Sequence, residues 1–295
     1  MVIQLRRMEK LNFAGLPEKF SNYKNAKFVI IPISYERTTT YMEGTKNAPL
    51  AILDASKNFE LYDEELNRVI AKSGIATLET LFLSEKSSEE MIKIVKETCL
   101  KVIKDDKFPV VIGGEHSITI GTVLGLKEKY FNFSVLQLDA HADLRNSYNG
   151  SIYNHACVMR RIREFTNAVQ IGIRSLSEEE MELIKKENFS IFFAHEMRKK
   201  FIMKEILRKI KEEKVFITID ADFFDPSLIP SVGTPEPGGF GWYETLNLLK
   251  GIINEKRVIG FDVVEFCPNK ENKTPDFIIA KFIYKLIGYI SQKLE

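Results

Sequence analysis

Two short segments of the chain carry acidic and imidazole side chains at regular spacing. SVLQLDAHAD places Asp139, His141 and Asp143 at alternate positions after an apolar run, and VFITIDADFFDP places Asp220 and Asp222 in the same way. Residues at i, i+2 and i+4 of an extended chain project to one side, so each segment predicts a cluster. Buried carboxylates need a counter-charge, and a cation supplies one. The spacing therefore predicts a metal site.

A third segment, PVVIGGEHS, places Glu115 and His116 just past another apolar run. The predicted ligand set then has two imidazoles and four carboxylates: His116, Asp139, His141, Asp143, Asp220 and Asp222. This set is too large for one tetrahedral zinc ion, and four negative charges balance two divalent cations. Oxygen-rich octahedral coordination favours two Mn²⁺ ions and leaves iron and cobalt open. Two ions about 3.5 to 4 Å apart can share a water and convert it to hydroxide, which predicts a hydrolase.

Other polar residues near these segments have structural interpretations. Asp225 precedes Pro226 and is predicted to form a turn or to support a ligand. His195 follows an apolar run that ends at Ala194, and it is predicted to be structural or surface-exposed. Neither residue joins the predicted metal site.

Apolar runs alternate with helical stretches along the chain. Most runs are unbroken, as is typical of strands covered on both faces, and strands are predicted at Phe28–Ile33, Pro109–Ile112, Ser134–Leu138, Val169–Ile173, Ser190–Phe193, Val215–Ile219 and Val258–Val263. Helices are predicted at Ser87–Lys104, Ile120–Tyr130, Ser177–Glu187, Met197–Glu213, Trp242–Glu255 and Thr274–Gln292. Alternation of strand and helix predicts a three-layer α/β/α fold with a largely parallel sheet. Ligands of such sheets bind beyond the carboxyl ends of the strands.

Composition and length restrict the class of protein. No linker rich in glycine, proline or serine divides the 295 residues, so residues 1–295 are predicted to form one domain. The formal net charge of +1 supplies no large field for nucleic acid or an anionic membrane. Three cysteines without CxxC spacing, and no long apolar segment, predict an unprocessed cytoplasmic protein. Ser34–Ala55 begins as a loop and could form a lid or an interface.

Six segments in this order resemble those of the ureohydrolase family, which contains the arginases and agmatinases. They are YMEGTKNAP (41–49), GGEHS (113–117), DAHADLR (139–145), NHACVMRR (154–161), TIDADFFDP (218–226) and GTPEPGG (233–239). The resemblance implies an arginase-like fold, a binuclear manganese centre and hydrolysis of a guanidino compound to urea and an amine. It also implies the same six metal ligands and a homo-oligomer, either a trimer or a hexamer.

The resemblance implies catalytic roles for two further residues. A planar, cationic guanidinium must be held and aimed, and a carboxylate does this through paired hydrogen bonds. Glu265, at the end of RVIGFDVVEF, matches the guanidinium-binding glutamate of the family. His155 matches the histidine that carries a proton to the departing amine, although NHAC departs from the more usual His-Gly.

The segments favour agmatine as the substrate, with putrescine and urea as products. LRNSYNGSIYNHAC matches poorly the loop with which arginases grip the amino-acid head, whereas HACVMRR and PSVGTPEPGG resemble agmatinases and place Glu236 near the expected mouth. N1-aminopropylagmatine, arginine and guanidinobutyrate are alternative substrates. A formiminoglutamase, a deacetylase-like amidohydrolase and an inactive metal-binding homologue are the alternative functions.

Overall fold

A nine-stranded sheet runs through the described residues, which are 11–199 and 202–294 of the computed structural model. Its order is β4 (Ile75–Thr77), β1 (Phe28–Ser34), β6 (Phe108–Ile112), β11 (Arg257–Val264), β10 (Lys214–Asp220), β7 (Ser134–Leu138), β8 (Asn167–Ile173) and β9 (Ser190–Phe193), with β5 (Leu81–Phe82) also paired to β1. Neighbouring strands of this sheet are parallel throughout. The prediction of a largely parallel sheet is confirmed.

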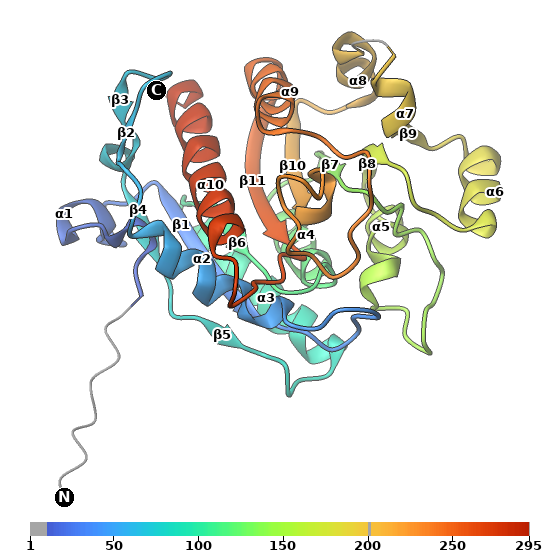
Figure 1. Ribbon diagram of the computed structural model, residues 1–295, viewed down its shortest axis with the longest axis horizontal. Helices are drawn as coiled ribbons and strands as arrows, with labels where there is room; N and C mark the ends of the chain where they lie inside the picture. The colour runs from blue at the N-terminus through green and yellow to red at the C-terminus, as the bar shows by residue number, and fades with distance from the viewer. Residues whose placement is uncertain (1–10, 200–201, 295) are drawn as a thin grey trace, which may run out of the picture.

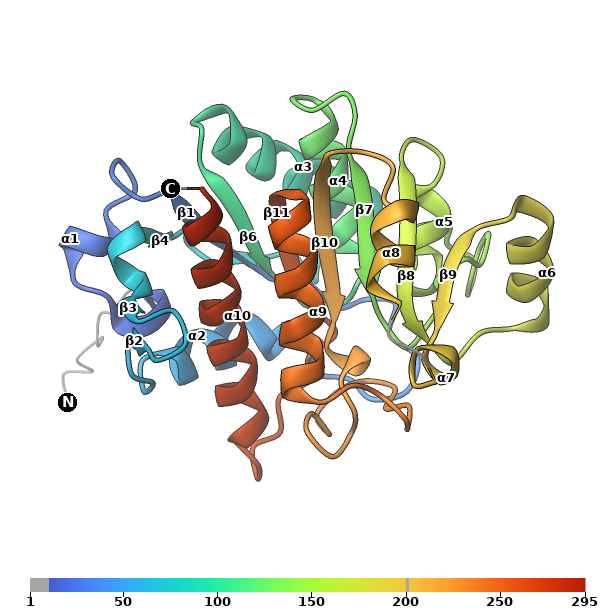
Figure 2. The ribbon, with the colours of Figure 1, turned by 90° about the horizontal axis from the view of Figure 1, so that it is seen from above.

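Helices cover both faces of this sheet, as Figures 1 and 2 show. One face carries α2 (Ala48–Ser56), α8 (Met203–Lys209), α9 (Trp242–Glu255) and α10 (Thr274–Lys293), and the other carries α3 (Ser88–Lys104), α4 (Ile118–Lys127) and α5 (Val158–Ile162). The other α-helices of the described residues are α1 (Glu18–Ser21), α6 (Glu178–Glu187) and α7 (Ala194–Met197). Strands β2 (Tyr62–Asp63) and β3 (Arg68–Val69) form a separate antiparallel pair. The three-layer prediction is confirmed.

Alternate residues of each strand enter two different cores. Phe28 and Ile30 of β1 pack in the core beneath α10, whereas Val29 and Ile31 pack in the core beneath α3 and α4. Complete burial of such a side chain stabilises the fold by about 1.5 to 3 kcal/mol. This alternation explains why the strands are unbroken apolar runs, because each face of the sheet needs its own apolar surface.

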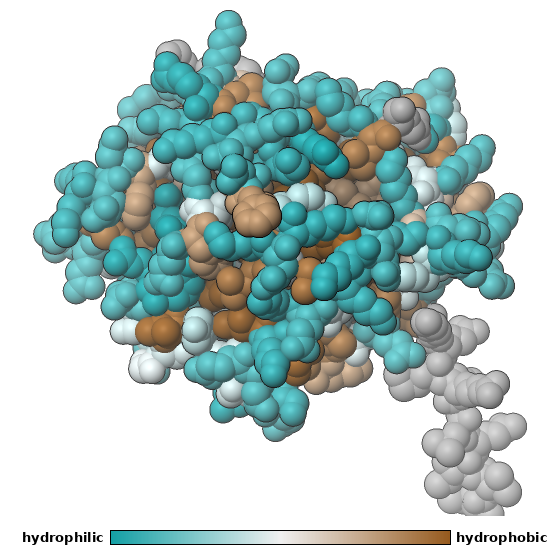
Figure 3. All heavy atoms as spheres, turned by 180° about the vertical axis from the view of Figure 1, so that it is seen from behind, coloured by the Kyte–Doolittle hydropathy of each residue, from teal (hydrophilic) through white to brown (hydrophobic). Residues whose placement is uncertain are grey.

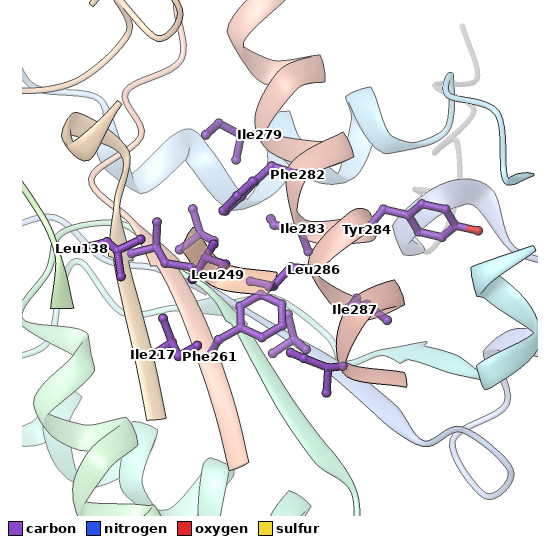
Figure 4. Close-up of a cluster of buried hydrophobic side chains, with 14 of the residues drawn as sticks. Leu138, Ile217, Leu249, Phe261, Ile279, Phe282, Ile283, Tyr284, Leu286 and Ile287 are labelled. Atoms are coloured by element: carbon purple, nitrogen blue, oxygen red, sulfur yellow. The ribbon is translucent and has the colours of Figure 1, made fainter. Parts of the chain in front are cut away.

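Helix α10 supplies much of the core on its face of the sheet. Figure 4 shows Ile279, Phe282, Ile283 and Leu286 directed from this helix toward the sheet, where Phe261 of β11 lies. Spacings of three and four residues place these side chains on one face of the helix. Because the helix is anchored in this way, it fixes the position of β11 beneath it.

One predicted helix is wrong in its extent. Met197–Glu213 was expected as a single helix, but the structure has α7, ending at Met197, and α8 over Met203–Lys209; residues 200 and 201 of the expected helix lie outside the described residues. Ile210 is extended, and the Glu213 carbonyl accepts a hydrogen bond from the backbone N–H of Arg257 at 3.0 Å. The chain is therefore already extended at Ile210 and bonded to the sheet at Glu213, where the expected helix would have continued.

The surface of the protein is mostly polar. Figure 3 shows hydrophilic residues over most of the face opposite to that of Figure 1, with apolar residues scattered between them. Among the described residues, no helix is long and apolar enough to cross a membrane.

Candidate active site

The order of the strands brings four carboxyl ends to one place. In the sheet, β6, β11, β10 and β7 are consecutive neighbours, although they are far apart along the chain. His116 follows β6, Glu265 follows β11, Asp222 follows β10 and Asp139 follows β7. All six residues predicted to bind metal, together with Glu265 and His155, lie at this edge and, except for Asp139, line one cleft of about 250 Å³.

The first group of metal-ligand candidates surrounds His116. Its Nδ1 lies 3.2 Å from Asp139 Oδ2, 3.1 Å from Asp143 Oδ2 and 3.3 Å from Asp220 Oδ2. This nitrogen is buried and has no hydrogen-bond partner within the described residues. A buried imidazole nitrogen facing three carboxylate oxygens is the donor set that a divalent cation requires.

A second group of candidates lies beside the first. His141 Nδ1 is 2.8 Å from Asp222 Oδ2 and 3.7 Å from Asp139 Oδ1. The ligand atoms of Asp139, His141 and Asp222 all lie within 4.8 Å of one another, as do those of His116, Asp139 and Asp220. Asp139 therefore belongs to both groups, because its Oδ2 lies in the first group and its Oδ1 lies in the second. If each group held an ion, this carboxylate would contribute a ligand atom to both.

The segment Asp139–Asp143 is not extended, which corrects the expected geometry. Strand β7 ends at Leu138, the Asp139 carboxylate accepts a hydrogen bond from the backbone N–H of His141 at 2.6 Å, and Asp143 has a φ of 53°. A short acidic side chain that binds the backbone two residues ahead turns the chain. As a result Asp143 faces His116, whereas His141 faces Asp222, and the ligands divide between two groups.

The second acidic segment turns in the same way. The Asp220 carboxylate accepts a hydrogen bond from the backbone N–H of Asp222 at 2.8 Å, and a 3-10 turn follows at Ala221–Phe223. Asp222 Oδ1 in turn accepts from the backbone N–H of Ala140 at 3.0 Å. These bonds join the two turns and hold their carboxylates in place.

Polar residues inside apolar strands support the ligands, and sequence reasoning missed them. Thr218 Oγ1 lies 2.9 Å from His116 Nε2, so the opposite ring nitrogen is the one that faces the carboxylates. The Gln137 amide donates to Asp139 Oδ2 at 2.6 Å. The available signal was a single polar side chain in an otherwise apolar strand, as in SVLQLD and VFITID.

Burial of the carboxylates shows that the site suits a cation. Desolvation raises the pKa of Asp139 to about 7, and the neighbouring charges of Asp222 and Asp143 raise it further. Desolvation also raises the pKa of Asp220 well above its usual value, with the charge of Asp222 as the next cause. A bound cation removes this unfavourable charge density, so the residues present fit the predicted metal centre.

Glu265 lies in the wall of the cleft next to the metal-ligand candidates. Its Oε1 accepts a hydrogen bond from the backbone N–H of His116 at 2.6 Å, and its φ of 59° turns the chain out of β11. Desolvation, followed by repulsion from Glu115, raises the pKa of Glu265 to about 8. A cationic substrate beside this carboxylate would favour its charged form.

His155 follows the DAHADLR segment along the chain, and its side chain lines the same cleft. The Asn154 side chain caps the short turn His155–Cys157 through the backbone N–H of Ala156 at 3.0 Å. Desolvation lowers the pKa of His155, although the charges of Asp143 and Glu115 oppose this change. The imidazole is therefore neutral near neutral pH and can both accept and return a proton.

The remaining candidates lie where their simpler interpretations place them. Asp225 accepts from the backbone N–H groups of Ser227, Gly238 and Gly239 at 3.0 to 3.2 Å, which confirms a turn. His195 is exposed and stacks on Phe193, with ring centroids 6.0 Å apart. Glu236 Oε1 lies 3.9 Å from His141 Nε2, at the outer side of the metal-ligand groups.

Comparison with known proteins agrees with this geometry. The sequence pattern of the Arginase family matches residues 26–288. The chain belongs to the arginase family. The N(1)-aminopropylagmatine ureohydrolase of Synechocystis sp. is 42% identical over 280 residues, covering 92% of each chain. The agmatinase of Pyrococcus horikoshii is 36% identical, covering 90% of this chain and 92% of that protein. Both are similar to this chain over nearly their whole length.

A solved arginase-family structure has the same fold. The agmatine ureohydrolase of Thermoplasma volcanium superposes with a TM-score of 0.84 at 33% identity, covering 92% of each chain. The predictions of the family, of the arginase-like fold and, at the level of the family, of a ureohydrolase enzyme are confirmed. The roles of single residues stay predictions that the geometry supports.

Proposed function

We propose that the protein hydrolyses the guanidino group of an agmatine-type amine to urea and the corresponding amine. One observation carries this proposal. Two groups of candidate metal ligands, which have Asp139 in common, lie in the same cleft as Glu265 and His155. A carboxylate beside a metal-ligand cluster can hold a guanidinium, and a neutral imidazole can move a proton. The cleft therefore contains the groups that amidine hydrolysis needs.

The six ligands would hold two divalent cations: His116, Asp139, Asp143 and Asp220 around one, and Asp139, His141 and Asp222 around the other. When bound, such a pair lowers the pKa of a shared water and supplies the nucleophile at neutral pH. We propose manganese because four carboxylates and two imidazoles suit it better than zinc. Metal analysis of the purified protein tests this identity.

Glu265 holds the substrate in the proposed reaction. Its carboxylate accepts hydrogen bonds from the guanidinium, and this contact aims the central carbon toward the metal-ligand groups. As water adds to that carbon, His155 takes up the proton that the water releases. His155 returns this proton to the alkyl nitrogen as the carbon–nitrogen bond to the alkyl chain breaks, so that urea and a protonated amine leave.

Two amines are the candidate substrates. The sequence segments favour agmatine, and the relative that is 42% identical acts, by its name, on N1-aminopropylagmatine, which is agmatine with a longer cationic tail. The cleft opens to solvent at the loop 39–42, where Tyr41 is 74% exposed, so the longer tail has space to leave the site. We propose that the protein accepts both amines.

A urea-release assay with Mn²⁺ tests the function. Arginine, agmatine, N1-aminopropylagmatine and guanidinobutyrate are compared at equal concentrations, and kcat/KM is measured for each. The expected result is release from the two agmatine-type amines that exceeds release from arginine by at least roughly 100-fold, since an unmatched charged head group is costly to bury. No urea from any of the four compounds, in protein that holds two ions per chain, would contradict the proposal.

The predictions of a trimer or hexamer and of a cytoplasmic location rest on the sequence alone. We propose that the protein assembles as a homo-oligomer, because the resemblance to the family implies it. Light scattering of the purified full-length chain measures the mass that decides between the two assemblies.

A further inference from the structure

The GGEHS segment contains a buried carboxylate, Glu115, that the proposed reaction does not use. Its side chain is inaccessible to solvent. Glu115 Oε2 accepts from the backbone N–H groups of Arg37 at 2.5 Å and Thr38 at 2.7 Å. Its Oε1 accepts from the hydroxyls of Thr38 at 2.7 Å and Ser117 at 2.5 Å. An ionised carboxylate only accepts, so four donors satisfy both of its oxygens.

Thr38 connects this carboxylate to the active-site histidine. The hydroxyl has one proton, which it donates to Glu115 Oε1, and two lone pairs. One lone pair accepts from the backbone N–H of His155 at 3.1 Å. The other faces His155 Nδ1 at 3.2 Å. Because the hydroxyl has already donated its proton, it can only accept from this ring nitrogen.

This arrangement selects one form of the neutral imidazole. If Thr38 Oγ1 accepts in its bond with the imidazole, the ring hydrogen of His155 is on Nδ1 and the lone pair is on Nε2. Within the described residues, no group hydrogen-bonds to His155 Nε2, and the ring lines the cleft. The unprotonated nitrogen is therefore the one available to the substrate.

We propose that Glu115 and Thr38 are positioning residues that hold His155 with its hydrogen on Nδ1, so that Nε2 exchanges the proton with the reacting nitrogen. The inference rests on the proton-transfer role of His155 in the proposed function. The same bonds hold the loop after β1. Arg37 and Thr38 donate to Glu115, and the residues that follow them, 39–42, line the cleft.

Substitution of Glu115 by glutamine gives the sharpest expectation. The amide oxygen can replace Oε2 and accept from the two backbone N–H groups, and the amide nitrogen then replaces Oε1 and donates to the hydroxyls. Thr38 would accept this hydrogen and donate its own to His155 Nδ1, which reverses the direction of the chain of bonds. Glu115→Gln should thus favour the opposite form, with the hydrogen on Nε2.

Three threonine variants test the pathway through turnover. Thr38→Val removes the hydroxyl and should lower kcat by roughly 10- to 100-fold, within the range that acid–base catalysis contributes, while KM changes less than about twofold. Thr38→Ser keeps the hydroxyl and should recover most of kcat. Thr98→Val is the matched control, because within the part of the chain that the structure describes its hydroxyl bonds only to the Ile94 carbonyl of its own helix. Equal kcat in Thr38→Val and wild type would overturn the inference.

A double-variant comparison separates this inference from the proposed function. If Thr38 acts through His155, then Thr38→Val should lower kcat in the wild-type background and leave His155→Ala unchanged. Full activity of His155→Ala would reject the role of His155 itself. A large loss in His155→Ala, with Thr38→Val causing the same further loss in both backgrounds, would reject only the positioning role.

Nitrogen NMR gives a measurement that does not depend on activity. The full-length protein contains four histidines, so ¹⁵N-histidine labelling yields few signals, and the His155→Ala spectrum assigns the one of interest. The sample carries Zn²⁺, which is diamagnetic, at a pH of about 8, where a neutral imidazole is expected. Wild type and Thr38→Ser should show protonated Nδ1, and Glu115→Gln should show protonated Nε2. Identical His155 spectra in wild type and Glu115→Gln would overturn the proposal.

Discussion

At the scale of single residues, Asp139 and Glu265 divide the work of the site. Asp139 has one carboxylate oxygen beside His116 and the other beside His141, at 3.2 and 3.7 Å. Glu265 has one oxygen fixed by the backbone of His116, and the cleft lies on its other side. In the proposed reaction, the first residue would hold ions and the second would hold the substrate. Separate substitutions can therefore distinguish loss of metal from loss of substrate contact.

Asp139→Asn should remove both ions, because the amide lowers the charge of the carboxylate that the two ligand groups share. We expect metal analysis to show that tightly bound ions are lost and urea release to fall by at least roughly 100-fold, while circular dichroism stays unchanged. Asp225→Asn is the control, since its carboxylate bonds to a turn instead. Two retained ions in Asp139→Asn would reject the assignment.

Glu265→Gln should keep both ions and lose turnover. The glutamine has nearly the same shape, but it lacks the charge that pairs with a guanidinium, and a hydrogen bond to a charged group contributes about 1.5 to 3 kcal/mol. This corresponds to roughly a 10- to 100-fold lower kcat/KM for agmatine. Glu265 contacts the backbone of His116, a candidate metal ligand, so the substitution could also disturb metal binding. Metal content is therefore measured as the control. Unchanged kcat/KM would show that another acid binds the substrate.

At the scale of elements, α10 is fastened to the segment around β2 by a buried ion pair. Lys285 Nζ lies 3.0 Å from Asp63 Oδ2 and 2.9 Å from Glu65 Oε2, and both Lys285 and Asp63 are buried. Tyr284, which Figure 4 shows directed away from the sheet, donates to the Leu61 carbonyl at 2.6 Å. These contacts hold the outer face of α10 while its inner face packs on β11.

Lys285→Met should destabilise the protein strongly without a direct effect on the site. Removing one partner leaves Asp63 buried and without its main counter-charge, which costs about 3 to 5 kcal/mol. Chemical denaturation measures this change in the free energy of unfolding. Lys57→Met is the matched control, because its partner Asp54 is exposed and such pairs contribute about 1 kcal/mol or less. A change of similar size in both variants would contradict the role of the buried pair.

At the scale of the whole molecule, negative charge is concentrated at one edge of the sheet, and bound cations would balance it. Four buried carboxylates meet at the ends of β7 and β10, whereas the chain as a whole has a formal net charge of only +1. Burial of like charges lowers stability, and ligands that bind only the folded state raise it. Metal binding and global stability should therefore be coupled.

Removal of metal by a chelator should lower the melting temperature of the wild-type protein. At a free Mn²⁺ concentration 1,000 times the Kd, one bound ion stabilises the folded state by about 4 kcal/mol. Calorimetry with Mn²⁺, and with EDTA in its place, measures the difference. Asp139→Asn should show little response to either addition, and equal melting temperatures of the wild type in both conditions would reject the coupling.

Much of the site could be predicted from the sequence, because its chemistry is concentrated in short segments. Runs such as SVLQLDAHAD carry the ligand types at fixed spacing, and unbroken apolar runs specify strands that are covered on both faces. The candidate ligand residues, the parallel sheet and the helix that begins after Ser87, which forms a capping box with Glu90, follow from such local patterns.

Tertiary structure decided which of these segments meet and how. The order β6-β11-β10-β7 places the ends of distant strands side by side, and no local pattern encodes that order. The left-handed turn at Asp143 divided the ligands into two groups, and strand pairing at Lys214 shortened the helix expected over Met197–Glu213. The contact between Glu115 and Thr38 spans 77 residues, so it exists only because β1 and β6 are neighbours in the folded sheet. Spacing along the chain determines which side chains are available, whereas long-range packing determines their partners.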